Sequence, residues 1–192
     1  MKSETWATCK LSYLDKLKQE IEQISKMPDP VFSEIKIDCR DIHDDNCVTQ
    51  WEPLLRNIGI NKETSVLYFF SFDPVLLENI LEKAKEQKKV RKVSTEKVYR
   101  AMSKINTKNR ELCKGVLYVG KTNSNFLSRF THHLGLVKSD TYALQLKYWA
   151  TEFKLSLFVA PMKLQPDEVY YLEHLETALH NSLHPLLGRS GH

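Results

Sequence analysis

The stretch of residues 115–135, GVLYVGKTNSNFLSRFTHHLG, constrains the fold of this chain more than any other. It begins with a short apolar run, which predicts a β-strand that turns at Gly120. Lys121 follows this turn, and the helix that we expect next carries Arg129 and His133. A lysine is a mobile point charge, whereas an arginine can bind two phosphate oxygens at once. The stretch therefore predicts a strand, a turn and a helix that together hold a phosphate group.

Length and composition limit the class of protein. A chain of 192 residues can form one full core, or one domain with an arm. Its hydrophobic content of 42% and charged content of 27% are typical of a soluble globular protein. We find no secretory signal and no apolar run near the ~20 residues of a membrane helix. The four cysteines form no CxxC pair, so we expect reduced thiols in a cytoplasmic protein without a membrane partner.

The charged residues are unevenly distributed. Residues 1–60 carry 8 Lys or Arg against 11 Asp or Glu, whereas residues 82–110 carry 11 against 3. A basic segment of this density can follow the backbone of a polyanion and release its counterions. It can equally form a solvated helix surface, so charge alone leaves both interpretations open.

Three segments have the composition of strands, namely residues 65–72, 114–119 and 152–160. The first, SVLYFFSF, is apolar throughout, which predicts a central strand covered on both faces. Residues 31–37 alternate only weakly and could form a further short strand, and residues 141–150 could form a short helix or an irregular buried segment. Helical signals occupy residues 10–27, 47–59, 74–86, 94–104, 125–137 and 166–184.

These elements predict an α/β fold of the α+β kind, in which helices cover a small three-stranded sheet. Residues 1–62 form a helical N-terminal arm, and residues 63–192 form the domain that contains the sheet. A basic helical segment at about residues 74–112, called the basic insertion below, lies between the first two predicted strands of this domain.

The last predicted helix places a carboxylate beside its apolar face. Its core positions are Leu172, Leu175, Leu179 and Leu183, and Glu176 lies one position from this stripe. Such a carboxylate is a surface residue, the partner of a buried lysine, or a functional group.

Several of these residues together resemble the core of GIY-YIG nucleases. Tyr118-Val119-Gly120 stands where that family has YIG, and Val66-Leu67-Tyr68 stands where it has GIY on the preceding strand. The last helix resembles the segment of bacterial excision-repair incision domains in which a glutamate binds the metal ion and a proline ends the helix. The matched residues are Tyr68, Tyr118, Lys121, Arg129, His133, Glu176 and Pro185. The resemblance covers roughly residues 64–188, without the basic insertion, and implies a mainly antiparallel sheet.

The chain departs from the family pattern in three respects. Val66 replaces the first glycine of GIY, and Gly188 stands where an asparagine is usual. In addition, 49 residues separate Tyr68 from Tyr118, far more than the family's short spacing. The extra residues include the basic segment, which favours the nucleic-acid interpretation of its charge.

The resemblance implies a metal-assisted hydrolysis of phosphodiester bonds. Glu176 would hold one divalent ion, Mg²⁺ or Mn²⁺, because a hard oxygen ligand with several waters suits such an ion. Arg129 would neutralise the oxygens of the transition state.

The resemblance also implies roles for the other matched side chains. Tyr68 or Tyr118 would accept the proton of the attacking water, and Lys121 would assist by lowering the pKa of that tyrosine. His133 would contact the phosphate or relay a proton.

We therefore expect an endonuclease that acts on nucleic acid, most simply double-stranded DNA, as a restriction or other defence enzyme. A homodimer is expected if the enzyme reads a palindrome. A second interpretation, motivated by Val66 and Gly188, is a catalytically inactive nucleic-acid-binding module on the same fold. A third gives the arm a role in protein interaction through Trp51 and the helix at residues 10–27.

Two other sets of side chains could bind a metal. Cys39, His43 and Cys47 have helical i, i+4, i+8 spacing, but structural zinc usually takes four ligands. Glu176, His180 and His184 share a helix face without forming the HExxH pattern of zinc proteases.

Overall fold

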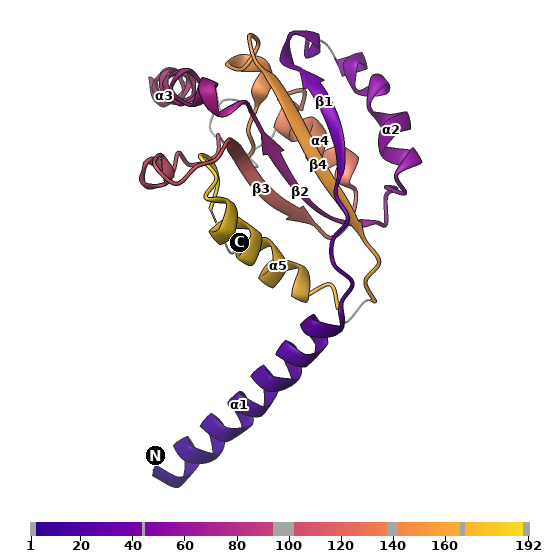
Figure 1. Cartoon of the computed structure of the whole chain (residues 1–192), viewed down its shortest axis with the longest axis vertical. Helices are drawn as coiled ribbons and strands as arrows, with labels where there is room; N and C mark the ends of the chain where they lie inside the picture. Colours follow the sequence, from indigo (N-terminus) through magenta and orange to yellow (C-terminus); the bar gives the residue numbers. More distant parts are fainter. Residues whose placement is uncertain (1–2, 44, 94–101, 138–141, 166–167, 190–192) are drawn as a thin grey trace.

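The structure is a computed structural model that describes residues 3–43, 45–93, 102–137, 142–165 and 168–189 (Figure 1). Its centre is an antiparallel sheet with the strand order β1-β4-β2-β3. The strands are β1 (Ser33–Asp38), β2 (Ser65–Ser71), β3 (Val116–Thr122) and β4 (Lys154–Met162). The α-helices are α1 (Ser3–Lys26), α2 (Glu52–Asn57), α3 (Leu77–Val93), α4 (Phe126–Leu134) and α5 (Tyr171–Leu183). No helix among the described residues is long and apolar enough to cross a bilayer.

The sheet has four strands, so the prediction of three strands is wrong. Strand β1 pairs with β4 from Ser33 opposite Val159 to Asp38 opposite Lys154. Only Ile35 and Ile37 are buried in this short edge strand, which explains its weak sequence signal. Part of the predicted helical arm therefore belongs to the sheet.

Strand β2 is the centre of the sheet, as its continuous apolar run predicts. It pairs with β3 on one side and with β4 on the other. Tyr68 and Phe70 pack on one face against the phenylalanines of α4, whereas Leu67 packs on the other face with Leu172 of α5. Helices α4 and α5 thus cover opposite faces of the sheet, and α5 lies next to β3 (Figure 1).

Strand β3 continues past the predicted turn. Gly120 pairs with Tyr68 and Lys121 pairs with Leu67, so both residues lie inside the strand. The prediction of a turn at Gly120 is therefore wrong. The chain turns instead before α4, where Asn125 has a φ of 50°.

The predicted helices differ mainly at their ends. The helix predicted at residues 10–27 is confirmed and begins earlier, at Ser3. The segment at 47–59 divides into a 3₁₀ turn (Asp45–Gln50) and α2, and the last helix begins at Tyr171. Residues 94–101 of the helix predicted at 94–104 lie outside the described residues.

Two further predictions concern buried segments. Residues 143–150 form a mostly buried segment with only one 3₁₀ turn (Leu146–Tyr148). Of the two alternatives for this region, the structure thus has the irregular buried segment and not the short helix. Trp51 is 4% exposed and packs edge-on against Phe130, so its side chain is not available to a partner protein.

The C-terminal segment pairs with the first residues of β3 at the outer edge of the sheet. The backbone N–H of Leu187 donates to the carbonyl of Leu117 (2.8 Å), and the N–H of Gly188 donates to the carbonyl of Lys104 (2.8 Å). Asn109 also donates through Nδ2 to the carbonyl of Pro185 (2.9 Å). The end of the basic insertion is thereby fixed next to β3.

Candidate active site

A cleft of about 1030 Å³ lies at the β3 edge of the sheet. It collects charged side chains from segments that are far apart in the sequence. The cationic residues that line it are Lys88, Lys104, Lys121, Arg129 and Arg189. Glu176 is the one carboxylate among the lining residues. Four of the predicted site residues therefore meet in one cleft, namely Tyr118, Lys121, Arg129 and Glu176.

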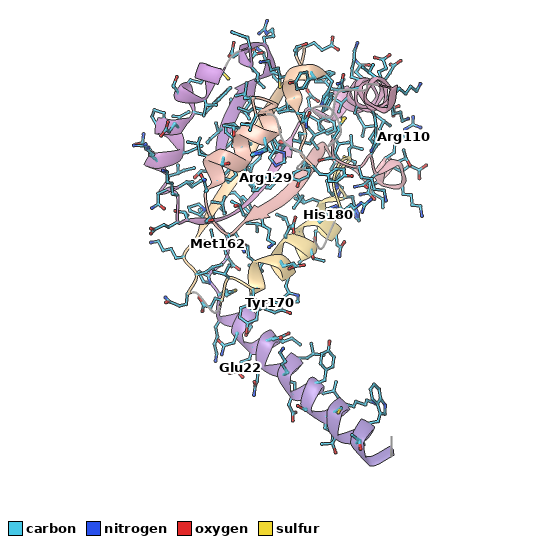
Figure 2. All side chains as sticks on the ribbon, turned by 180° about the vertical axis from the view of Figure 1, so that it is seen from behind. Glu22, Arg110, Arg129, Met162, Tyr170 and His180 are labelled. Carbon is cyan, nitrogen blue, oxygen red and sulfur yellow. The ribbon has the colours of Figure 1, made fainter. Side chains whose placement is uncertain are left out.

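Arg129 is held by both predicted tyrosines. Its Nε donates to the hydroxyl of Tyr68 (3.3 Å), and its Nη2 donates to the hydroxyl of Tyr118 (3.2 Å) and to the carbonyl of Tyr142 (2.9 Å). These three bonds use the Nε and Nη2 donors and, among the described residues, leave the two N–H groups of Nη1 for a ligand. Figure 2 shows Arg129 above the sheet, on the side away from α5. Arg129 therefore lines the same cleft as Lys121, the other cationic residue of the stretch that is predicted to hold a phosphate group.

His133 lies behind the cleft and is fully buried. The backbone N–H of Leu144 donates to its Nδ1 (3.2 Å), so a neutral ring carries its proton on Nε2. This Nε2 lies 2.9 Å from the hydroxyl of Tyr68 and donates to it. Burial, with smaller contributions from Arg129 and His132, holds the pKa of His133 well below its usual range. The geometry therefore makes His133 a neutral residue that positions Tyr68, without the predicted phosphate contact.

The two tyrosines occupy different environments. Tyr68 is fully buried, and its burial and the nearby Tyr118 raise its pKa, against the opposing effect of Arg129. This direction is opposite to the lowered pKa expected of a general base assisted by Lys121. Tyr118 lines the cleft, and its ring stacks on that of Tyr68 with centroids 6.2 Å apart. Of the two phenols, Tyr118 is therefore the one that a ligand in the cleft can reach.

Two glycines allow this arrangement of phenols. A Cβ atom on Gly120 would lie 2.6 Å from the hydroxyl oxygen of Tyr68 and 2.6 Å from Cε1 of Tyr118. Gly188 has a φ of +109°, and a Cβ there would lie 3.0 Å from Cε2 of Tyr118. Gly120 is thus required for close approach rather than for a turn. Gly188 meets the Tyr118 ring with its backbone, at the position where the family pattern has an asparagine.

Glu176 lies at the centre of the buried face of α5, although the leucine stripe predicted it at the edge. Leu172, Glu176 and His180 are buried, whereas the other three leucines of the stripe are only partly buried. Figure 2 shows His180 on the same helix. Oε2 of Glu176 and Nε2 of His180 have no hydrogen-bond partner among the described residues. Burying a carboxylate oxygen without a partner costs folding free energy, unless a ligand in the cleft supplies the missing interaction.

The electrostatic environment of Glu176 explains its titration. Burial raises its pKa to about 7, while Lys121 and Arg129 oppose this shift and Glu173 adds to it. The ionised carboxylate is therefore stabilised only when positive charge is close.

This carboxylate fits a hard divalent cation. Mg²⁺ keeps several waters and is commonly held by one or two carboxylates together with substrate phosphates. The described residues contain no group of three or more His, Cys, Asp or Glu that could hold a metal. Neither Cys39, His43 and Cys47 nor Glu176, His180 and His184, all of them described residues, therefore forms a three-ligand metal site. Burial also raises the pKa of the Cys39 thiol to about 12, which keeps it protonated.

No protein-family model, curated protein or solved structure matches the chain. The resemblance to GIY-YIG nucleases therefore stays a prediction that rests on the residues of the sequence.

Some residues of the cleft were not predicted individually. Lys88 and Lys104 belong to the basic run, which marks a charged segment but not which of its side chains face inward. Arg189 and Tyr142 had no recognisable signal, because one is placed by the pairing of residues 186–188 with β3 and the other by its backbone contact with Arg129.

The raised pKa of Glu176 predicts a specific pH dependence of stability. Its folded pKa of about 7 exceeds the ordinary value of 4.5. The group therefore contributes stability that is complete below pH 4.5 and is lost as the pH rises through 7. His133 and His180 have lowered pKa values and act with the opposite sign, so a comparison with Glu176→Gln is needed to isolate Glu176.

Between pH 5 and pH 8, we expect the free energy of unfolding of wild type to fall relative to Glu176→Gln by on the order of 2 kcal/mol. Urea denaturation of both proteins at each pH measures this difference. A difference that stays constant with pH would show that Glu176 ionises normally in the folded protein.

Proposed function

We propose that the protein is a metal-dependent endonuclease of the GIY-YIG type that hydrolyses phosphodiester bonds of DNA. One observation carries this proposal. The buried, unpartnered carboxylate of Glu176 on α5 shares a cleft with the guanidinium of Arg129 on α4, although the two helices cover opposite faces of the sheet. The cleft is open at β3, where the two faces meet.

The charge of the cleft favours a polyanionic substrate. Five cationic side chains line it with one carboxylate, and they come from α3, the end of the basic insertion, β3, α4 and the C-terminal segment. Lysine and arginine side chains bind phosphates and release the counterions that surround a nucleic acid. Binding of DNA should therefore weaken steeply as the salt concentration rises.

The residues of the cleft have complementary roles in this reaction. The free N–H groups of Arg129 donate to the phosphate oxygens, whose negative charge increases in the transition state. Tyr118 lines the cleft and, as the phenolate, accepts the proton of the attacking water, and Lys121 contributes a further positive charge.

The residues behind the cleft hold these groups in place. Tyr68 and His133 fix the guanidinium and the Tyr118 ring from the interior of the domain. A Mg²⁺ or Mn²⁺ ion held by Glu176 would supply Lewis-acid polarisation of the phosphate.

Plasmid cleavage tests the proposal. Wild type should convert supercoiled DNA to nicked or linear forms with Mg²⁺ or Mn²⁺, and should not do so with EDTA. Arg129→Ala should cleave poorly. Arg110→Ala is its matched control, because Arg110 lies in the same basic region but is exposed and paired with Glu78 (2.7 Å). Salt-sensitive DNA binding with no cleavage by wild type under any metal would instead support an inactive binding module.

A further inference from the structure

Helix α1 presents an apolar surface that the rest of the protein does not cover. The helix projects away from the sheet and its covering helices (Figures 1 and 2). Its exposed large apolar side chains are Trp6 (71%), Leu11 (63%), Tyr13 (61%), Leu14 (40%) and Ile21 (67%). Most of the stability of a helix in a protein comes from packing of its apolar face, and this helix of 24 residues leaves its large apolar side chains exposed.

The spacing of the apolar residues is that of a coiled-coil seam. Positions 7, 10, 14, 17, 21 and 24 follow each other at alternating steps of three and four residues. Four of these positions, from 14 to 24, are Leu or Ile. A strict 3-4 repeat keeps one narrow face toward a partner helix of the same kind.

The seam is symmetric about its midpoint, so it can pair with the same seam of a second copy of the chain. When two α1 helices run antiparallel with residue 14 opposite residue 17, every seam position of one meets a seam position of the other. The layers are then Ala7 with Ile24, Lys10 with Ile21, and Leu14 with Leu17, each occurring twice. Such a face is self-complementary, as a twofold interface requires.

The one polar seam residue selects the antiparallel orientation. In a parallel pair, Lys10 would face Lys10 of the second copy. In the antiparallel pair, Lys10 faces Ile21 of the second copy and lies beside Glu20, the residue that precedes it. The antiparallel order therefore replaces a repulsion with an attraction between opposite charges.

The area of this face is sufficient for a dimer. Leu14 and Ile21 lie on the seam, whereas Trp6, Leu11 and Tyr13 each lie one residue from a seam position and flank it. A buried aromatic side chain covers ~150–250 Å², so the seam and its flanks together offer roughly 600 Å² in each copy. Two copies would bury roughly 1,200 Å², which is at the lower limit of stable interfaces. A single apolar patch of this size is also at the upper limit for a monomer.

We propose that α1 is the dimerisation helix, and that it pairs in antiparallel orientation with α1 of a second copy. The pairing joins two copies of the cleft in one particle. It depends on α1 alone and does not rest on the proposed nuclease activity.

Sedimentation equilibrium of the full chain tests the interface. Wild type should form a particle of twice 22.4 kDa at about 10 µM. Leu14→Glu should raise the dissociation constant by at least about 100-fold, because it buries two uncompensated charges. Gln19→Glu is the matched control, since it adds the same charge at an exposed position outside the seam and should leave the dimer intact.

A wild type that stays at 22.4 kDa up to about 100 µM would overturn the proposal, and so would a Leu14→Glu variant that remains dimeric. If wild type is monomeric, the apolar face of α1 binds a different protein. Glu176→Gln should still dimerise, so failure of the nuclease proposal would leave this test unaffected.

A charge exchange tests the orientation. Lys10→Glu and Glu20→Lys should each weaken the dimer by about fivefold or more, because each sets like charges side by side. The double variant should return to nearly the wild-type dissociation constant. Failure of this rescue would overturn the antiparallel order. Circular dichroism of each variant controls for the Lys16–Glu20 pair (3.8 Å) within α1, which Glu20→Lys also removes.

Discussion

Replacing Glu176 with glutamine is expected to slow DNA cleavage by at least about 10³-fold, while the protein stays folded. Glutamine has the shape of glutamate but cannot supply a negatively charged oxygen to a divalent ion. The carboxylate faces a cleft whose other charged lining residues are cationic, so no second acid among them can replace it. Cleavage of a labelled duplex under single-turnover conditions measures the effect.

Glu173→Gln provides the matched control for this experiment. Glu173 lies one turn earlier on α5, is only partly buried and does not line the cleft. The Glu173→Gln variant should therefore cleave DNA at close to the wild-type rate. Equal rates for Glu176→Gln and Glu173→Gln would remove Glu176 from the mechanism and leave its burial without a functional explanation.

The same substitution is expected to stabilise the protein above pH 7. A neutral amide avoids the cost that burial imposes on the ionised carboxylate, which is the cost that raises the pKa of Glu176 to about 7. Loss of activity together with a gain in stability is characteristic of a functional group that opposes folding. A residue retained only for structure would lose stability when it is replaced.

Local sequence patterns were sufficient to predict the strand that carries Tyr118 and the helix that carries Arg129, whereas Lys121 lies inside the strand and not after it. These residues lie within one strand and the helix that follows it, so their relative positions depend on short connections. Glu176 was also predicted, because its distance from Pro185 at the end of the last helix matched a known pattern. The structure places all four around one cleft.

The features that were not predicted depend on contacts between distant segments. The strand character of β1 becomes clear only when it pairs with β4, because two buried isoleucines give little periodicity. The burial of His133 depends on its contacts with Tyr68 and with the N–H of Leu144. The leucines of α5 predicted a core face one position away from the buried one, because three of these leucines lie beside the buried face and are only partly buried.

Gly120→Ala is expected to reduce cleavage by about 10²- to 10³-fold through the positions of the phenols. A methyl group at residue 120 would lie 2.6 Å from the Tyr68 hydroxyl, which is well inside contact distance. Tyr68 has no open space to move into, because it is fully buried. Its displacement would break the bonds to Arg129 (3.3 Å) and His133 (2.9 Å) and shift the guanidinium in the cleft.

The same clash is expected to lower the free energy of unfolding by about 2–3 kcal/mol, through overpacking and the lost hydrogen bonds. Gly59→Ala separates this effect from catalysis. A Cβ on Gly59 meets no atom within 4 Å, but its φ of +86° is strained for alanine, so this variant should lose about 1 kcal/mol of stability and keep its activity. If Gly120→Ala cleaves DNA at the rate of Gly59→Ala, the distance between strand β3 and the phenols does not control the reaction.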